Sequence, residues 1–179
     1  MINLVDIVSA LTGQTLPNLD FHISSVAIDS RLVTKKGLFI ALPGDKVNGH
    51  DFVQSAFENR ADLALVDQDI HLEVPTLDLR NEHFHPPSTK PTFPLCLRVE
   101  DTLAALQTIA SHWRDKFSIR TIGITGSVGK TSTKELTASL LSEKFSVLKN
   151  PGNMNNEIGL PLTLLRLEPQ HQVAVLEMG

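Results

Sequence analysis

The sequence predicts an α/β protein in two parts, a small α/β unit followed by a parallel-sheet domain that carries a phosphate-binding loop. Short apolar runs alternate with amphipathic helical segments along the 179 residues, and strands separated by helices pair in parallel. One apolar run, 121–125, leads directly into a glycine loop that opens a helix. With 41% hydrophobic and 20% charged residues, the composition suits one large or two small globular domains.

The first predicted domain covers residues 1–99. It opens with a helix over 3–12, where Asn3 is suited to the N-cap and Gly13 ends the helical pattern. Apolar runs bounded by turn residues indicate short strands. The other expected elements are strands at 21–28, 37–42, 63–66 and 95–99, a loop at 44–50 and a helix at 51–60.

Two stretches near the end of this domain carry no predicted chemistry. Residues 80–94 contain four prolines and no hydrophobic period, which indicates a loop. His83 and His85 lie in it without a third ligand at useful spacing, so we expect no metal site there. Cys96, the only cysteine, lies in an apolar run and is expected to be buried rather than nucleophilic.

The second predicted domain covers residues 100–179. Asp101 is suited to cap a helix over 102–117, with Trp113 on its apolar face and therefore in the core. The sequence then predicts strands at 121–125, 146–148 and 173–176, helices at 130–145 and 157–167, and loops at 126–129 and 150–156.

The strongest motif is the glycine loop between the strand 121–125 and the next helix. Backbone N–H groups of such a loop can surround phosphate oxygens, and the dipole of the following helix favours an anion. Lys130 would reach the β- and γ-phosphates of ATP, and Thr131 would offer its hydroxyl to Mg²⁺. The loop is a variant of the common pattern, since Ile124 stands where its first glycine is usual. The expected nucleotide-binding residues are Gly126, Ser127, Val128, Gly129, Lys130, Thr131 and Ser132, with Lys130 as the catalytic residue.

An acidic residue, Glu177, follows the apolar run 173–176. The carboxyl ends of parallel strands face the ligand side of a sheet. Glu177 could therefore hold Mg²⁺ opposite Thr131. A solvated glutamate at a strand end is the alternative interpretation.

The charge balance and the apolar runs exclude several classes of protein. The chain has 16 Lys and Arg against 20 Asp and Glu, a net charge of −4, and it does not predict a nucleic-acid partner. No apolar run approaches the roughly 20 residues that span a bilayer, so no membrane insertion is expected. The N-terminal residues lack a signal-peptide pattern. We expect a cytoplasmic protein; the oligomeric state is left open, with a monomer expected.

The loop Thr-Gly-Ser-Val-Gly-Lys-Thr-Ser-Thr-Lys-Glu, 125–135, resembles that of the Mur ligases, the ATP-dependent amide ligases that build the peptidoglycan stem peptide. Residues 150–165, which begin Asn-Pro-Gly-Asn-Met-Asn-Asn, are similar to the branch of the family that adds D-alanyl-D-alanine. Glu177 matches the family's magnesium glutamate. Three segments look like the family's uridine-nucleotide-binding domain: 28–31, 37–42 and 44–52.

The resemblance implies that the γ-phosphoryl group of ATP passes to the carboxylate of a UDP-N-acetylmuramoyl-tripeptide. D-Ala-D-Ala would then attack the acyl phosphate and give an amide, ADP and phosphate. ATP and Mg²⁺ would be the cofactors, with Thr131 and Glu177 as metal ligands. Polar side chains such as Ser, Asn and Arg suit uracil, ribose and diphosphate groups. The expected substrate-binding residues are Ser30, Arg31, Asn48, Gly49 and His50 at the UDP end, and Asn153, Asn155 and Asn156 near the sugar and peptide.

Two other interpretations stay open. One is a related ATP-dependent ligase of the folylpolyglutamate or cyanophycin type, and the other is a non-catalytic nucleotide-binding fragment. The second arises because residues 100–179 supply only the first strands of the family's ATP-binding sheet. We therefore expect a truncated ATPase domain and no turnover from this chain alone. The sequence does not give the third stem residue, diaminopimelate or lysine.

Overall fold

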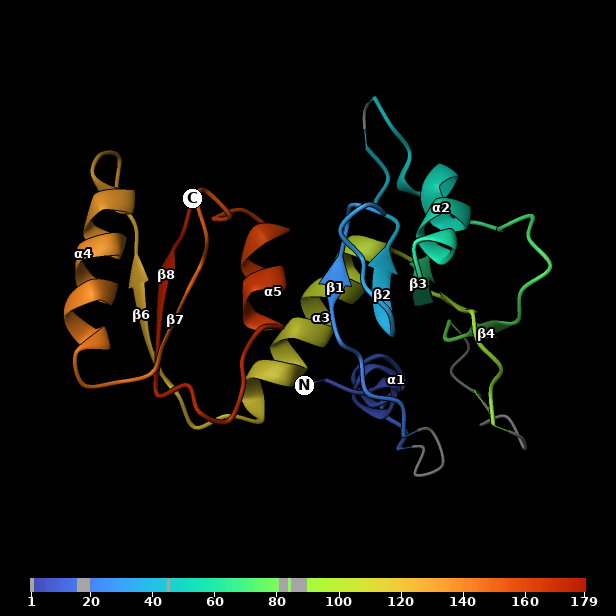
Figure 1. The fold of residues 1–179 in the computed structure, drawn as a ribbon, viewed down its shortest axis with the longest axis horizontal. Coiled ribbons are helices and arrows are strands. Elements are labelled where there is room, and N and C mark those ends of the chain that lie inside the picture. The colour runs from blue at the N-terminus through green and yellow to red at the C-terminus, as the bar shows by residue number, and fades with distance from the viewer. Residues whose placement is uncertain (1, 16–19, 45, 81–83, 85–89) are drawn as a thin grey trace. The chain divides into compact units, whose positions relative to one another are not determined.

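The computed structural model describes residues 2–15, 20–44, 46–80, 84 and 90–179. The chain forms two compact units, Met1–Ile109 and Ala110–Gly179, and each contains one parallel sheet (Figure 1). Helix α3 (Thr102–Asp115) spans the division between them. The predicted fold class, α/β with parallel sheets, is confirmed. The domain boundary after residue 99 stays a prediction.

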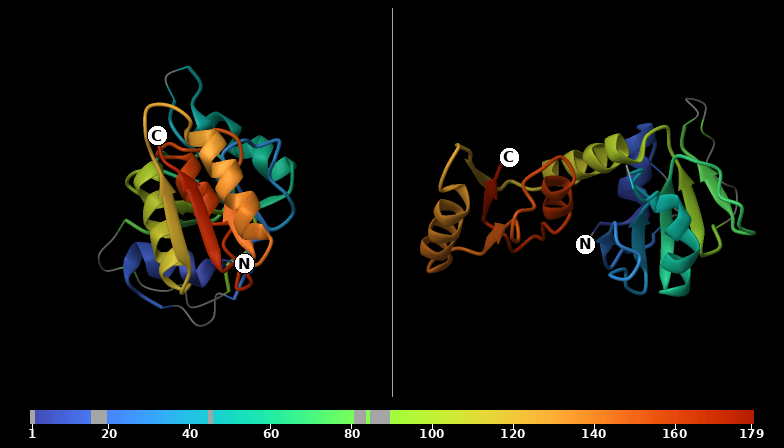
Figure 2. Two further views of the ribbon diagram at one scale, coloured as in Figure 1. Left: turned by 90° about the vertical axis from the view of Figure 1, so that its left-hand side faces the viewer. Right: turned by 90° about the horizontal axis from the view of Figure 1, so that it is seen from above.

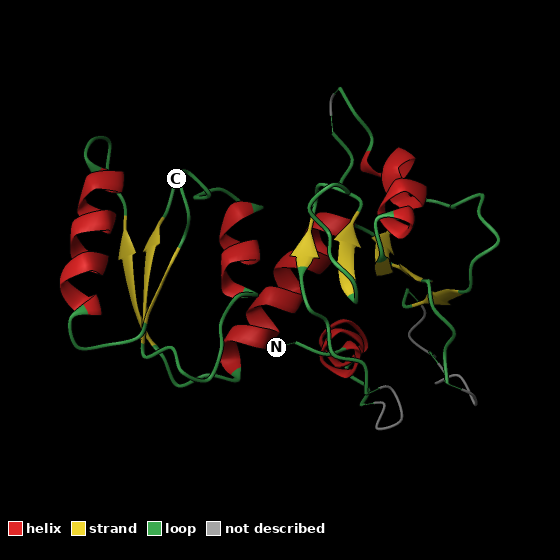
Figure 3. Cartoon of the chain, viewed as in Figure 1, coloured by secondary structure: helices red, strands yellow, loops and turns green. Residues whose placement is uncertain are grey.

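The sheet of the first unit has five parallel strands in the order β1-β2-β3-β5-β4. The inner strands β2, β3 and β5 are apolar and almost completely buried, whereas β1 and β4 form the edges (Figure 3). Parallel strands buried on both faces read as continuous apolar runs, which is why the inner three could be predicted. The strands are β1 (Val26–Ala27), β2 (Gly37–Ile40), β3 (Ala61–Val66), β4 (Thr76–Asp78) and β5 (Leu95–Arg98).

Helix α1 (Leu4–Thr12) has the predicted caps at both ends. The Asp6 N–H donates to Asn3 Oδ1 (2.7 Å), and the Asn3 N–H donates to Asp6 Oδ2 (2.9 Å), so the two residues form a capping box. Gly13 then takes the left-handed conformation, φ 71°, and ends the helix.

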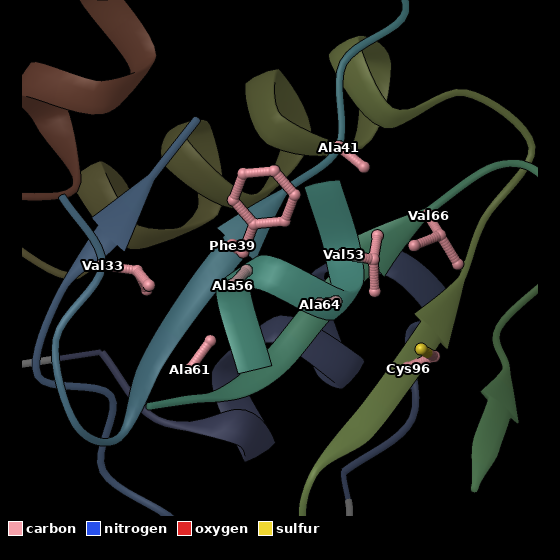
Figure 4. Packing of buried hydrophobic residues seen from close by; sticks show 9 residues of the cluster. All are labelled: Val33, Phe39, Ala41, Val53, Ala56, Ala61, Ala64, Val66 and Cys96. Atoms are coloured by element: carbon pink, nitrogen blue, oxygen red, sulfur yellow. The ribbon is translucent and has the colours of Figure 1, made fainter. Parts of the chain in front are cut away.

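Helix α2 (Val53–Glu58) follows a 3-10 turn, η1 (Gly49–Phe52), and packs against β3. Figure 4 shows side chains of α2, β2, β3 and β5 meeting in one buried cluster. Burial raises the pKa of the Cys96 thiol to about 11, so Cys96 behaves as the buried hydrophobic residue that was predicted. The cluster comprises Val33, Phe39, Ala41, Val53, Ala56, Ala61, Ala64, Val66 and Cys96.

The sheet of the second unit has three parallel strands in the order β6-β8-β7. The middle strand β8 is buried along its whole length, and Ala138 of helix α4 (Lys130–Ser142) packs against it. The ribbon in Figure 2 shows α4 alongside this sheet. Trp113 is buried and its Nε1–H donates to the Leu167 carbonyl at 3.1 Å, so its predicted place in the core is confirmed. The remaining elements are β6 (Arg120–Ile124), β7 (Val147–Lys149), α5 (Gly159–Leu164) and β8 (Val173–Glu177).

The strand predicted at 21–28 is much shorter in the structure, where only Val26–Ala27 pair with β2. The backbone of residues 21–23 pairs with another segment instead. The Leu4 N–H donates to the Phe21 carbonyl and the Ile23 N–H to the Ile2 carbonyl, each at 3.0 Å, and His22 forms an isolated antiparallel bridge with Asn3.

The edge strand β4 was not predicted, because three residues with an exposed-intermediate-exposed pattern give no recognisable period. The helices expected at 51–60, 130–145 and 157–167 are present but end earlier, at Glu58, Ser142 and Leu164. Much of the loop expected at 80–94, with His83 and His85, lies outside the described residues.

Candidate functional site

The phosphate loop joins β6 to α4, and at two of its positions the backbone takes a conformation that favours glycine. Gly126 has φ 139° and Gly129 has φ 79°, and an L side chain is strained at both angles. Gly129 is the N-cap of α4, and its carbonyl accepts the Thr133 N–H at 2.9 Å. The loop therefore presents exposed backbone at the positive end of a helix of 13 residues, which is a suitable place for an anion.

Lys130 folds back over this loop. Its Nζ donates to the Gly126 carbonyl at 2.7 Å, and the side chain remains partly exposed. A neutral carbonyl is a weaker partner for an ammonium than a phosphate oxygen. Lys130 is thus held over the loop by a contact that a phosphate could replace. Val128, at the tip, is 91% exposed.

The carboxylate of Glu177 lies at the carboxyl end of β8, where it is 2% exposed. Its Oε1 accepts hydrogen bonds from Thr131 Oγ1 (3.1 Å) and Asn155 Nδ2 (2.9 Å). The Asn155 amide is the main cause that lowers the pKa of Glu177; Thr131 and the Lys134 ammonium act in the same direction and burial opposes them. Glu177 is therefore a buried ionised carboxylate beside the phosphate loop.

The oxygen atoms of this site fit a hard divalent cation. Glu177 Oε2 is buried and accepts no hydrogen bond from any described residue, with the Lys134 ammonium 3.6 Å away, and the Thr131 hydroxyl lies beside the same carboxylate. No three His, Cys, Asp or Glu residues of the described ranges gather into a metal cluster. Mg²⁺ needs no such cluster, because it keeps several waters and is completed by phosphate oxygens.

The loop after β7 is tied to Glu177 by Asn150, a fully buried residue that the sequence analysis missed. Asn150 Oδ1 accepts the Glu177 N–H (2.9 Å), and its Nδ2 donates to the carbonyls of Glu177 (3.1 Å) and Met154 (2.8 Å). The Asn150 amide thus pairs with the backbone of Glu177 as a neighbouring strand would. Its position directly after strand β7, at the start of the Asn-rich loop 150–156, was the available signal.

The three asparagines predicted to bind substrate differ in their surroundings. Asn155 contacts Glu177, as described above, and the Asn156 side chain accepts the Gly159 N–H, at the first residue of α5, at 2.9 Å. Asn153 is exposed, and its carbonyl accepts the Asn155 N–H at 2.8 Å. Asn155 therefore belongs to the cluster around Glu177, whereas Asn153 and Asn156 shape the loop next to it.

In the first unit, Ser30 and Arg31 follow β1 in a tight turn. The Arg31 guanidinium, 82% exposed, pairs with Asp29 (Nη2–Oδ2 2.6 Å) and lowers the pKa of that carboxyl to about 2. Ser30 is buried, and its carbonyl accepts the Asn59 side-chain amide at 3.1 Å. Arg31 therefore offers an exposed, oriented cation, while Ser30 anchors the turn.

Asn48 and His50 shape the loop after β2. Asn48 Oδ1 accepts the His50 backbone N–H (3.1 Å) and lies 2.8 Å from His50 Nδ1. His50 Nε2 accepts the Asp67 N–H at 3.1 Å. Burial lowers the pKa of His50, which favours the neutral ring with Nδ1–H donating to Asn48. Both ring nitrogens are thus engaged within the protein, although the ring also lines a pocket of about 230 Å³ with Gln68 and other residues.

Gly49 lies where a side chain has no room. A Cβ there would stand 2.6 Å from the Leu42 carbonyl oxygen and 2.7 Å from the Leu42 nitrogen. The Gly49 N–H donates to that same carbonyl at 2.9 Å. This close approach of two backbone segments accounts for a glycine between Asn48 and His50.

The structure therefore brings the predicted phosphate loop, Thr131, Asn155 and Glu177 together in the second unit. The residues predicted for the UDP end lie in the first unit, in the loops after β1 and β2. Sequence reasoning missed Asn150 and Lys134, two buried polar residues beside Glu177.

In the part of the chain that the structure describes, no helix is long and apolar enough to cross a membrane.

Comparisons with known proteins match both units. The family model described as "Mur ligase family, catalytic domain" matches residues 22–114, and the "Mur ligase middle domain" model matches residues 124–179. The first of these covers more than half of the chain.

Two of the similar curated proteins are each named UDP-N-acetylmuramoyl-tripeptide–D-alanyl-D-alanine ligase. The Synechocystis protein is 39% identical over 96% of this chain and 34% of its own length. The Escherichia coli protein is 34% identical over 99% of this chain and 35% of its own length. This chain thus spans about a third of the length of the curated relatives it matches.

Solved structures agree. A crystal structure of MurF from Acinetobacter baumannii superposes with a TM-score of 0.73 at 29% identity, covering 98% of this chain and 35% of that one. MurF from Thermotoga maritima, solved in complex with ADP, gives a TM-score of 0.65 at 31% identity over 86% of this chain and 31% of that one. With both units matched in sequence and in structure, the chain belongs to the Mur ligase family.

Proposed function

We propose that this chain is part of a UDP-N-acetylmuramoyl-tripeptide–D-alanyl-D-alanine ligase. Its first unit would bind the uridine nucleotide of the substrate, and its second unit would bind ATP at the phosphate loop. The observation that carries the proposal is the phosphate loop placed beside the buried Glu177–Thr131 pair. The names of the relatives and the ADP-bound structural neighbour support it.

The reaction requires two displacements. A carboxylate oxygen of the tripeptide attacks the γ-phosphorus of ATP, and the bond to the ADP oxygen breaks. The amine of D-Ala-D-Ala then attacks the carbonyl carbon of the acyl phosphate, phosphate leaves with the bonding pair, and the amine loses a proton. Phosphoryl transfer of this kind depends mainly on positioning and on neutralising charge.

The residues of the loop would supply that positioning. Backbone N–H groups of 126–132 would hold the β- and γ-phosphates at the N-terminus of α4, and Lys130 would exchange its bond to Gly126 for a phosphate oxygen. Thr131 and Glu177 would hold Mg²⁺. That ion, when bound, would neutralise phosphate charge and orient the triphosphate.

The residues predicted to bind substrate occur in each of the two units. Arg31 offers an exposed cation suited to a diphosphate, and Ser30, Asn48, Gly49 and His50 form the turn and loop that would surround the UDP end. Asn155, with Asn153 and Asn156 in the same loop, would meet the sugar and peptide. Amide side chains offer a donor and an acceptor together, which suits such a ligand.

The test of the nucleotide role is binding of MgATP to the chain by isothermal titration calorimetry. We expect Lys130→Ala to weaken binding at least about tenfold, as loss of a charge-assisted hydrogen bond predicts. Lys149→Ala is the matched control, since Lys149 is an exposed lysine of the same unit that pairs with Glu135. Equal affinity of Lys130→Ala and the wild type would overturn the assignment.

A further inference from the structure

Among the described residues, Lys134 is an unusual charged residue, because its side chain is completely buried. It lies on α4 one helical turn after Lys130, outside the residues that would bind phosphate or Mg²⁺. Lysine is almost never fully buried unless its ammonium is paired. The partners of Lys134 therefore indicate what the residue does.

Two of these partners are backbone carbonyls of the Asn-rich loop. Lys134 Nζ donates to the Asn150 carbonyl at 3.0 Å and to the Gly152 carbonyl at 2.8 Å. An ammonium has three N–H donors, so one remains. Two carboxylates are close to it, Glu135 Oε1 at 3.3 Å and Glu177 Oε2 at 3.6 Å.

The two carboxylates are not equivalent. Glu135 is about half exposed and also pairs with Lys149, so water and a second cation share its charge. Glu177 is buried, and its Oε2 accepts no hydrogen bond from any residue in the described ranges. The Lys134 ammonium consequently faces Glu177 Oε2, the oxygen that accepts no hydrogen bond. Thr131 and Asn155 donate hydrogen bonds to the other oxygen, Oε1.

We propose that Lys134 is a positioning residue, which fixes the Asn-rich loop to α4 and holds the Glu177 carboxylate turned toward the phosphate loop. Lys134 thereby keeps the loop that carries Asn155 in a fixed position relative to helix α4, which carries Thr131. The inference rests on the proposed function, since it assumes that Glu177 and Thr131 hold the metal of a bound nucleotide.

A purely structural role would have a different signature. If Lys134 only stabilised the fold, replacing it would lower the melting temperature but leave ligand binding by the folded protein unchanged. A positioning residue changes the part of the binding that depends on the metal. Residues that orient a metal ligand typically alter metal affinity about 10- to 100-fold.

The experiment compares Lys134→Met and Lys134→Arg with the wild type, with Lys149→Met as the control at an exposed lysine. Affinity for ADP is measured with and without Mg²⁺, below the melting temperature of each variant. We expect Lys134→Met to weaken MgADP binding about tenfold and metal-free ADP binding much less. Lys134→Arg should recover part of the loss, and Lys149→Met should match the wild type.

Amide hydrogen exchange of the ligand-free chain gives a second readout. The Glu177 N–H bonds to Asn150 Oδ1 and the Gly179 N–H to the Asn155 carbonyl. In Lys134→Met both amides should exchange faster, while amides in the middle of α4 keep their protection. If Lys134→Met binds MgADP as the wild type does and keeps the protection of both amides, the inference is overturned and the proposed function stands.

Measurements on the wild-type chain decide two further cases, in which the wild type does not bind MgADP or the variant does not fold. Wild type that fails to bind MgADP overturns the proposed function, and hydrogen exchange then still tests the link between Lys134 and the loop. If Lys134→Met does not fold, ¹⁵N-lysine NMR of the wild type takes its place. A protected Lys134 ammonium signal that shifts with MgADP but not with ADP alone supports the inference; an unprotected or unresponsive signal overturns it.

Discussion

Replacing Asn150 with alanine tests the link between the Asn-rich loop and Glu177. The substitution removes three hydrogen bonds of 2.8–3.1 Å and leaves three backbone groups without their partner, the N–H and carbonyl of Glu177 and the carbonyl of Met154. A buried backbone group that loses its partner costs about 1–3 kcal/mol. Because the shortened side chain would admit water, we take the lower value for each group and expect a loss of about 3 kcal/mol in the free energy of unfolding of the second unit.

Urea denaturation followed by tryptophan fluorescence measures this loss directly. Trp113 is the only tryptophan of the chain and is buried in the second unit, so its emission reports that unit. Asn153→Ala is the matched control in the same loop; its side chain is exposed, and we expect a change within about 0.5 kcal/mol. If Asn150→Ala loses no more than Asn153→Ala, the pairing of Asn150 with β8 does not stabilise the unit and the reasoning is refuted.

Three further predictions concern the first unit. Gly49→Ala should destabilise it by about 1–3 kcal/mol in thermal unfolding, because the new Cβ would meet the Leu42 backbone at 2.6 Å; an unchanged melting temperature would contradict this. The pKa of His50 is lowered by burial from 6.5, so the unfolded state binds more protons just below that pH, and stability should fall as pH drops through 6.5. Circular dichroism of wild type and His50→Gln should show a shallower fall for the variant, and parallel curves would exclude His50 as the cause. The pKa of the Cys96 thiol is raised to about 11, so Cys96 should resist a thiol reagent at pH 8 until urea unfolds the unit; rapid labelling of the native chain would disprove its burial.

The elements that could be predicted are those whose own residues carry the signal. β2, β3, β5, β6 and β8 are apolar runs between turn residues, and α1 carries its caps at Asn3 and Gly13. β4 could not be predicted, because an edge strand of three residues is defined by its partner β5 rather than by a pattern of its own. The expected strand at 21–28 was wrong over most of its length for a related reason, because the backbone of residues 21–23 pairs with residues 2–4 and not with β2.

The candidate site divides in the same way. The phosphate loop and Glu177 could be predicted, because glycines before Lys-Thr and a carboxylate after an apolar run are local patterns. Lys134 and Asn150 could not, because each is defined by partners far along the chain: Lys134 reaches residues 16 and 18 positions away, and Asn150 reaches Glu177, 27 positions away. A polar residue buried by such contacts looks in the sequence like any exposed lysine or loop asparagine.

An NMR titration of the ¹⁵N-labelled chain, first with UDP and then with MgADP, tests whether the first unit binds a uridine nucleotide and the second unit binds an adenine nucleotide. We expect UDP to shift resonances around Arg31 and Asn48–His50, and MgADP to shift those of residues 126–132 and Glu177. UDP shifts confined to residues after 120, or no response of residues 126–132 to MgADP, would show that the two sites are wrongly assigned.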